Sequence, residues 1–317
     1  MLHRDREAVP EALNLVDDRR PDRRAEALEL LDTLERETPF PGASRIGLTG
    51  APGSGKSTLL DALVRELRPR GETVAIVAVD PSSRKTGGAL LGDRIRVRSG
   101  AADPGVFIRS LAARDQLGGL AESAWAAVAI LATSFDRVFV ETVGVGQSED
   151  EVAALVDTLV YVGTPGAGDT LQFMKAGILE LPDVFVVNKS DIGSAAARTA
   201  SELESGVGLG ERDPSQPVPQ VVLTSARDGA GIAELIAAVD AHRQQQLDSG
   251  TLRERRQLGR ETQLLLALER RYGSFGIGKL GDPPALRERI RKDRRSSAFA
   301  LLACLGREIE DALEKSS

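Results

Sequence analysis

A glycine-rich segment at residues 50–58, Gly-Ala-Pro-Gly-Ser-Gly-Lys-Ser-Thr, restricts the possible folds of this chain more than any other part of the sequence. It fits the pattern G-x-x-x-x-G-K-[ST] and directly follows the short apolar run at 46–48. Such a loop needs a strand before it and a helix after it, because its backbone N–H groups curve around phosphate oxygens in front of a helix N-terminus. The segment therefore predicts a strand–loop–helix unit that binds a nucleoside triphosphate.

The side chains of this loop have separate expected roles. The glycines let the backbone approach the phosphates, where a side chain would block it. Lys56 can reach the β- and γ-phosphates, and the hydroxyl of Ser57 can bind Mg²⁺. The expected phosphate-binding residues are Gly53, Ser54, Gly55, Lys56, Ser57 and Thr58.

A second motif indicates which base is bound. The apolar, β-branched run at 183–187 is typical of a buried strand, and it ends in Asn188-Lys189-Ser190-Asp191, which fits N-K-x-D. The carboxylate of Asp191 can accept hydrogen bonds from the ring N–H and the exocyclic amine of guanine, whereas adenine has no such donor pair on that edge. Lys189 can lie along the base plane, and Asn188 can tie the loops together. Guanine is therefore the expected base.

One more strand supports the guanine assignment. The run at 221–223 ends in Thr224-Ser225-Ala226, which matches the last base-contacting loop of GTPases. We expect Ser225 and Ala226 to lie beside the base.

Hydrolysis and metal binding are predicted from the strands between these motifs. The strand at 137–140 ends at Glu141, three residues before Gly144, where many GTPases have Asp-x-x-Gly. The carboxylate of Glu141 can hold Mg²⁺ directly or through water, and the N–H of Gly144 can contact the γ-phosphate. Gln147 is a candidate for orienting the attacking water. The expected catalytic residues are Lys56, Glu141, Gly144 and Gln147.

The remainder of the chain suggests three parts. Residues 1–44 have a helical pattern, residues 45–247 alternate apolar strands with helical stretches, and residues 248–317 lack strand signals. This order predicts an α/β fold of the P-loop GTPase type, in which a mostly parallel sheet carries helices on both faces and helical extensions flank it. Residues 301–313 carry an apolar stripe at helical spacing, which either the same chain or a second subunit covers.

Composition excludes several functions. One cysteine and two histidines leave no disulfide framework or structural zinc spacing. The chain has no signal peptide and no apolar run of membrane-spanning length, so the expected location is the cytoplasm. The Arg-rich stretch at 287–295 is interpreted as the solvated face of a helix, with a docking surface for an acidic partner as the alternative. Aromatic residues make up 3% of the chain, so nucleic-acid binding is not expected.

Several further segments carry a family resemblance. The segments Val79-Asp-Pro-Ser-Ser83, Glu141-Thr-Val-Gly-Val-Gly-Gln-Ser-Glu149 and Pro165-Gly-Ala-Gly-Asp169 resemble those of the MeaB/ArgK-type GTPases, densely so over residues 45–230. These are the G-protein chaperones of adenosylcobalamin-dependent acyl-CoA mutases such as methylmalonyl-CoA mutase. The resemblance implies slow GTP hydrolysis to GDP, a homodimer formed through the C-terminal helices (248–317), and control of cofactor delivery to a B12-dependent mutase.

The resemblance also implies particular residues. The magnesium site would comprise Ser57, Asp80, Asp93 and Glu141. Segments 80–96 and 141–151 would be switches, and 164–177 would relay the nucleotide state to the mutase. Thr170 and Ala176 depart from the family pattern, so the identity of the mutase stays open.

Two other functions are retained as alternatives. One is an ArgK-like kinase that uses ATP or GTP and is linked to amino-acid transport. The other is a metal-delivery GTPase of the nickel type, which would need a Cys/His cluster.

Overall fold

The computed structural model describes residues 5–18, 20–81, 100, 102–113, 122–142, 149–166, 181–209, 218–293 and 296–315. The strands within these ranges are β1 (Ser44–Thr49), β2 (Val74–Pro81), β3 (Val106–Ala113), β4 (Arg137–Thr142), β5 (Thr158–Gly163), β6 (Val184–Val187) and β7 (Gln220–Leu223). The helices are α1 (Val9–Asp17), α2 (Pro21–Glu37), α3 (Lys56–Leu67), α4 (Glu122–Ser134), α5 (Glu149–Ala153), α7 (Ser194–Leu209), α8 (Ile232–Ser249), α9 (Thr251–Ile277), α10 (Pro283–Lys292) and α11 (Ala298–Glu314). Short 3₁₀ turns lie at Arg68–Arg70, Ser190–Ile192 and Gly278–Leu280.

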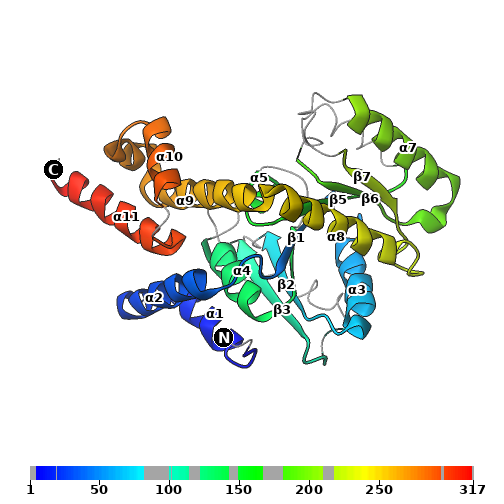
Figure 1. The fold of residues 1–317 in the computed structure, drawn as a ribbon, viewed down its shortest axis with the longest axis horizontal. Coiled ribbons are helices and arrows are strands. Elements are labelled where there is room, and N and C mark those ends of the chain that lie inside the picture. Colours follow the sequence, from blue (N-terminus) through cyan, green and yellow to red (C-terminus); the bar gives the residue numbers. More distant parts are fainter. Residues whose placement is uncertain are drawn as a thin grey trace.

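The strands form one seven-stranded sheet in the order β3-β2-β4-β1-β5-β6-β7 (Figure 1). Every strand pair is parallel, and β1 lies between β4 and β5. This confirms the α/β P-loop fold with a parallel sheet. Strands β3 and β5 were not among the strands predicted from the sequence. β3 carries Arg109 and Ser110 within its apolar run, which weakens its strand pattern.

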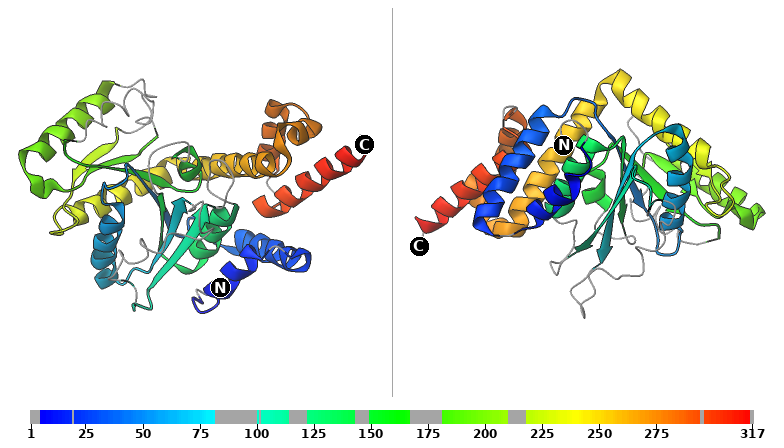
Figure 2. Two further views of the ribbon diagram at one scale, coloured as in Figure 1. Left: turned by 180° about the vertical axis from the view of Figure 1, so that it is seen from behind. Right: turned by 90° about the horizontal axis from the view of Figure 1, so that it is seen from below.

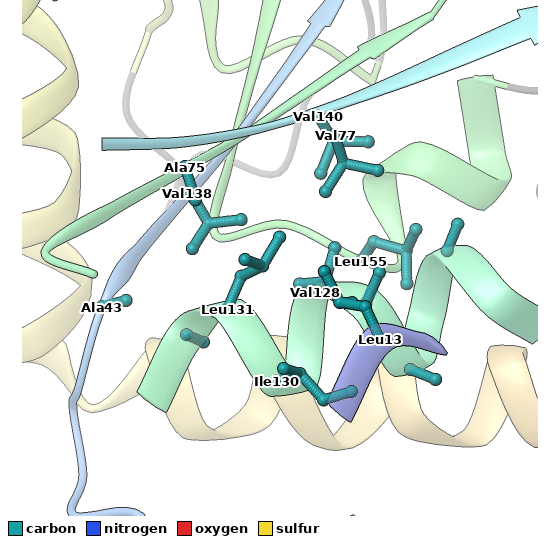
Figure 3. Close-up of a cluster of buried hydrophobic side chains, with 14 of the residues drawn as sticks. Leu13, Ala43, Ala75, Val77, Val128, Ile130, Leu131, Val138, Val140 and Leu155 are labelled. Atoms are coloured by element: carbon teal, nitrogen blue, oxygen red, sulfur yellow. The ribbon is translucent and has the colours of Figure 1, made fainter. Parts of the chain in front are cut away.

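Helices cover both faces of the sheet because side chains alternate along each buried strand. Val74 and Ile76 pack with α3 and α8, while Ala75 and Val77 pack with α4 on the other face. Figure 3 shows the second of these clusters, with Val138 and Val140 of β4 above Val128 and Leu131 of α4. Helix α7 covers the outer strands β6 and β7.

The N-terminal helices are part of this core. Val9 and Leu13 of α1 and Leu31 and Leu34 of α2 are buried in the same cluster as α4 and the sheet. Figure 2 shows α1 and α2 beside α4, with α11 next to α2. The predicted helical extension therefore packs against α4, which covers this face of the sheet.

The C-terminal helices bury their own apolar stripe. Leu301, Leu305 and Ile309 of α11 are each at most 4% exposed, and they pack against α9 and α10 of the same chain. Ser297 caps the N-terminus of α11, and its side chain accepts a hydrogen bond from the N–H of Ala300 at 3.0 Å. The stripe therefore needs no second subunit to cover it. No helix within the described ranges is long and apolar enough to cross a membrane.

The described arginines of the Arg-rich stretch are exposed, as predicted for a solvated face, and they also pair with neighbouring helices. Arg287 and Arg291 of α10 pair with Glu261 of α9 at 2.9 and 2.7 Å, and the side chain of Glu261 is 0% exposed. Arg289 pairs with Glu308 of α11. These arginines hold α10 against its neighbours because a buried carboxylate requires charged partners. The sequence pattern missed this because both acidic partners lie on other helices.

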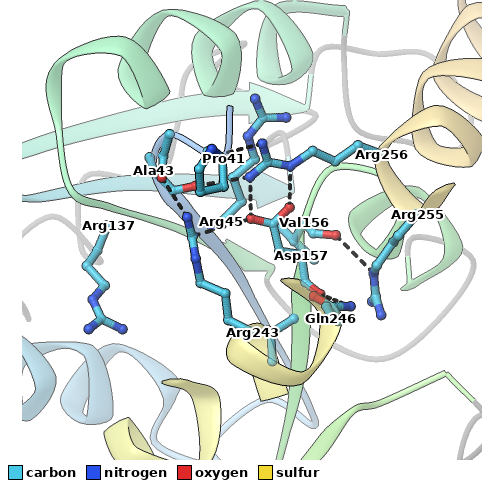
Figure 4. A network of polar contacts seen from close by, with 12 residues as sticks. Pro41, Ala43, Arg45, Arg137, Val156, Asp157, Arg243, Gln246, Arg255 and Arg256 are labelled. Carbon is cyan, nitrogen blue, oxygen red and sulfur yellow. Dashed lines mark hydrogen bonds and ion pairs between the residues drawn. The ribbon is translucent and has the colours of Figure 1, made fainter. Parts of the chain in front are cut away.

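A buried carboxylate joins three parts of the chain at the amino ends of the strands (Figure 4). Asp157, which precedes β5, is 0% exposed and accepts hydrogen bonds from Arg256 of α9 at 2.8 and 2.7 Å. The same guanidinium donates to the carbonyl oxygens of Pro41 and Ala43. The backbone N–H of Arg45 in β1 donates to Asp157 at 3.1 Å. The N-terminal segment, the sheet and α9 are therefore fastened at one point.

Asp157→Asn is expected to destabilise the protein in a pH-dependent way. Burial raises the pKa of Asp157, but the hydrogen bonds and charge of Arg256 and the charge of Arg45 outweigh it, so the pKa lies below its ordinary value. A lowered pKa in the folded state contributes stability above the unfolded pKa of about 3.9, and this contribution is lost as the pH falls through the folded value. We expect a loss of about 3–5 kcal/mol in the free energy of unfolding at pH 7, measured by urea denaturation.

The matched control for this substitution is Asp240→Asn. Asp240 pairs with Arg137, but its side chain is 45% exposed, so we expect a loss of at most about 1 kcal/mol. The difference between Asp157→Asn and the wild type should shrink below pH 4. Equal losses for the two variants, or a difference independent of pH, would contradict the assigned role of Asp157.

Candidate nucleotide-binding site

The sequence motifs meet at the carboxyl edge of the sheet. The glycine-rich loop follows the central strand β1, Glu141 lies in β4 on one side, and Asn188 and Ser225 follow β6 and β7 on the other. Open parallel sheets bind ligands at this edge, beyond the ends of their strands. The sheet order therefore places the predicted metal ligand Glu141 on the β4 side of the phosphate-binding loop, which we call the metal side. The base-contacting residues after β6 and β7 lie on the opposite side, which we call the base side.

Close packing explains two glycines of the loop. Gly50 has φ +140°, and a Cβ there would lie 2.2 Å from the carbonyl oxygen of Val162 in β5. Gly55, the residue before α3, has φ +91°, and a Cβ there would lie 2.6 Å from Nδ2 of Asn188. Both positions combine a left-handed backbone with a close neighbour, so they exclude larger residues. The loop can then lie tightly between β5 and the base-side loop.

The side chain of Lys56, which is predicted to bind phosphate, is held inside the glycine-rich loop. Its side chain lies at the first position of α3 and is 6% exposed. The Nζ atom donates to the carbonyl oxygens of Gly50 at 2.7 Å and Ala51 at 3.1 Å. A buried ammonium group in front of a helix N-terminus is suited to bind phosphate oxygens.

The two predicted metal ligands with described side chains lie together. The hydroxyl of Ser57 donates to Oε1 of Glu141 at 2.7 Å, although the residues are 84 positions apart. Both offer hard oxygen atoms, which suit Mg²⁺ bound by few protein ligands and completed by phosphate and water. The donor set therefore fits a magnesium ion. Within the described part of the chain, no group of three or more His, Cys, Asp or Glu side chains forms a metal site.

The base side is organised around Asn188, which is 1% exposed. Its amide nitrogen donates to the carbonyl oxygen of Ser54 at 2.9 Å, and its amide oxygen accepts from the Thr224 hydroxyl and the Ala226 N–H, each at 3.2 Å. Lys189, with φ +61°, reaches back to the carbonyl oxygen of Gly53 at 2.8 Å. These contacts tie the three loops to one another.

The carboxylate of Asp191 is positioned by its neighbours. The hydroxyl of Ser225 lies 3.0 Å from Oδ1 of Asp191 and 3.2 Å from Oδ2 of Asp228. The guanidinium of Arg227 lies 3.4 Å from Oδ2 of Asp191. Thr224 belongs to the predicted motif Thr224-Ser225-Ala226, but sequence reasoning did not single out Arg227 or Asp228 as site residues. Their adjacency to Ser225 was the available signal, because residues next to a base-contacting loop share its surroundings.

The remaining predicted residues are only partly described. The backbone of Asp80 lies at the end of β2, the strand beside β4, where it pairs with Ala112 of β3. The side chain of Asp80 lies outside the described residues, as do Asp93, Gly144 and Gln147 and the switch positions 82–96 and 167–177. Their roles stay predictions.

Comparisons with known proteins agree with this geometry. A family model described as "Methylmalonyl Co-A mutase-associated GTPase MeaB" matches residues 9–271. A protein of Pyrococcus abyssi is 48% identical over 215 residues, which are 67% of this chain and 66% of that relative. GTPase ArgK of Escherichia coli K12 is 38% identical over 259 residues, 80% of this chain and 77% of the relative. The solved structure of a LAO/AO transport system kinase aligns over 99% of this chain and 95% of its own, with 27% identity and a TM-score of 0.67.

Proposed function

This chain belongs to the MeaB family of GTPases, and we propose that its GTP hydrolysis gates the loading or protection of adenosylcobalamin on a B12-dependent acyl-CoA mutase such as methylmalonyl-CoA mutase. The chain is a GTP hydrolase. The observation that carries the mutase assignment is the extent of the family match. It covers the N-terminal helices and most of α9 as well as the nucleotide-binding sheet.

The protein's own groups account for binding and orientation of the nucleotide. Lys56 and the loop N–H groups would neutralise the β- and γ-phosphate oxygens, and Asp191 would accept the two N–H groups of guanine. Ser57 and Glu141, with Asp80 and Asp93, would hold Mg²⁺, which supplies charge stabilisation of the phosphoryl oxygens when bound. Gly144 would contact the γ-phosphate, and Gln147 would orient the water. No covalent intermediate with the protein is required.

A homodimer is proposed through the C-terminal helices. Leu258 and Phe275 of α9 are 55% and 71% exposed, so a second subunit that packs along α9 would bury both of these apolar side chains. We expect light scattering to give a molar mass twice the chain mass of 33.7 kDa. The double variant Leu258→Asp, Phe275→Asp should have the mass of a single chain. A monomeric wild-type protein would contradict this proposal.

The mutase proposal is tested by measuring GTP turnover with and without purified methylmalonyl-CoA mutase, with Lys56→Ala as the inactive control. We expect a complex and a higher turnover number when the mutase is present. If methylmalonyl-CoA mutase and other B12-dependent acyl-CoA mutases neither bind nor change the rate, the chaperone role is wrong.

The resemblance to a transport system kinase supports one alternative, an ATP- or GTP-dependent kinase. It would be favoured if ATP bound more tightly than GTP and if radiolabelled γ-phosphate appeared on a protein instead of as free phosphate. Asp191 argues against a preference for adenine. Metal delivery, the other alternative, would require stoichiometric nickel binding.

A further inference from the structure

Helix α9 lies along the segment 151–156, which contains the end of α5 (Figure 1), and contacts it from Arg255 to Arg270. Gln263 donates from Nε2 to the carbonyl oxygen of Glu151 at 3.0 Å, and Arg270 donates to Oε1 of Glu151 at 2.5 Å. Glu151 is 6% exposed and Gln263 is 4% exposed. Both the backbone and the carboxylate of Glu151 are therefore held by α9.

Two more α9 residues extend this contact. A Cβ on Gly259 would lie 2.2 Å from the carbonyl oxygen of Ala154, so α9 approaches the chain there as closely as a glycine allows. Arg255 donates from Nε to the carbonyl oxygen of Val156 at 3.2 Å. Positions 255, 259, 263 and 270 lie on one face of the helix because their spacings are four, four and seven residues. We call this set of contacts the α5–α9 seam.

The seam lies next to the segment expected to sense the γ-phosphate. Strand β4 ends at Thr142 and α5 begins at Glu149, so residues 143–148, which include Gly144 and Gln147, connect the two. At the start of this connection, Glu141 is held by Ser57. At its far end, Glu151 is held by Arg270 and Gln263. The described residues on both sides of this connection are therefore held in place.

We propose that Arg270, Gln263 and Gly259 are positioning residues for GTP hydrolysis, which act by fixing α5 through the seam. This inference rests on the proposed role of segment 141–148 in contacting the γ-phosphate. A loosened seam destabilises the GTP-bound state more than the GDP-bound state, because only GTP offers the γ-phosphate contact. Because the seam joins α5 to α9, a nucleotide that changes the preferred position of α5 also changes the preferred position of α9.

The chain contains a natural reporter for this coupling. Trp125 of α4 is its sole tryptophan, and its ring lies 4.4 Å from that of Phe299 in α11. It also packs against the cluster that α9, α10 and α11 form. A movement of α9 that reaches the C-terminal helices should therefore change the fluorescence of Trp125.

The experiment compares two pairs of variants in the whole 317-residue chain. Gly259→Ala places a methyl group against the carbonyl oxygen of Ala154 and so forces α9 away from the segment after α5. Its matched control is Gly278→Ala, where a Cβ would meet nothing within 4 Å. Arg270→Gln removes the ion pair with Glu151, and its control is Arg289→Gln, which loses a pair with Glu308 away from α5. The dissociation constants of a non-hydrolysable GTP analogue and of GDP, the turnover number and the melting temperature are measured for each. Gln263→Leu is a milder third variant.

We expect the seam variants to lower the affinity for the GTP analogue relative to GDP by roughly two- to tenfold, with a similar fall in turnover number. They should also lose the nucleotide-dependent difference in Trp125 fluorescence, while both controls keep wild-type behaviour. Folded seam variants with a wild-type affinity ratio and turnover would overturn the inference, even if their melting temperatures fall, and would leave the proposed function intact. A wild-type protein that binds no GTP would refute the proposed function itself.

Discussion

Lys56→Ala is expected to lower the GTP turnover number by roughly two to three orders of magnitude. In the structure, the Lys56 ammonium group is already oriented by the carbonyl oxygens of Gly50 and Ala51. It therefore needs little reorganisation to meet the β- and γ-phosphate oxygens. Alanine removes the buried ammonium group of this loop, so the developing phosphoryl charge loses one of the cations that would stabilise it. Phosphate release under saturating GTP measures the effect.

The control for this prediction is Lys292→Ala. Lys292 of α10 has a 76% exposed side chain and pairs with Glu288 on the same helix. Its removal should change neither turnover nor GDP affinity. A Lys56→Ala protein that retains more than a tenth of wild-type turnover would show that hydrolysis does not depend on this lysine.

Asp191→Asn is expected to weaken GDP binding by roughly a hundredfold or more and to change the preferred base from guanine to xanthine. The carboxylate can accept both N–H groups of guanine, whereas an asparagine amide offers one acceptor and one donor group. Xanthine carries an oxygen in place of the exocyclic amine, so it matches the amide. Because Ser225 holds Oδ1 of Asp191 at 3.0 Å, the substituted amide should keep the same position. Competition between GDP, XDP and ADP measures the preference.

Asp228→Asn is the matched control for base recognition. Asp228, like Asp191, accepts a hydrogen bond from the Ser225 hydroxyl, but it lies outside the N-K-x-D motif. This substitution should preserve the preference for guanine. If Asp191→Asn still prefers GDP over XDP, the base is not recognised by this carboxylate.

Much of the site was predictable because each motif is local. A strand, a tight loop and the side chains at its end occupy about ten consecutive residues, so the phosphate loop and the N-K-x-D loop are visible without a structure. β3 was missed because polar residues interrupt its apolar run. Thr224 supplies a buried hydroxyl to Asn188, and no pattern in the sequence marks that contact.

The charged residues were less predictable than the site. Arg287 and Arg291 are exposed, as predicted for a solvated face, yet they pair with a buried glutamate on α9 that the sequence pattern does not reveal. Asp157 precedes an apolar strand and has no local partner, but three arginines from β1, α8 and α9 surround it. The partners of a buried charge come from distant segments, so local sequence does not identify them.

The amino-acid sequence alone determined the class of fold, the nucleotide and the chemistry at each strand end, because these depend on short runs of residues and on their hydrogen-bonding groups. The tertiary structure decided the strand order, which places β1 between the metal side and the base side. It also decided that α9 lies against α5, and that the C-terminal helices bury their own apolar stripe. These arrangements follow from contacts between residues about a hundred positions apart, and such packing is settled only when the whole core assembles.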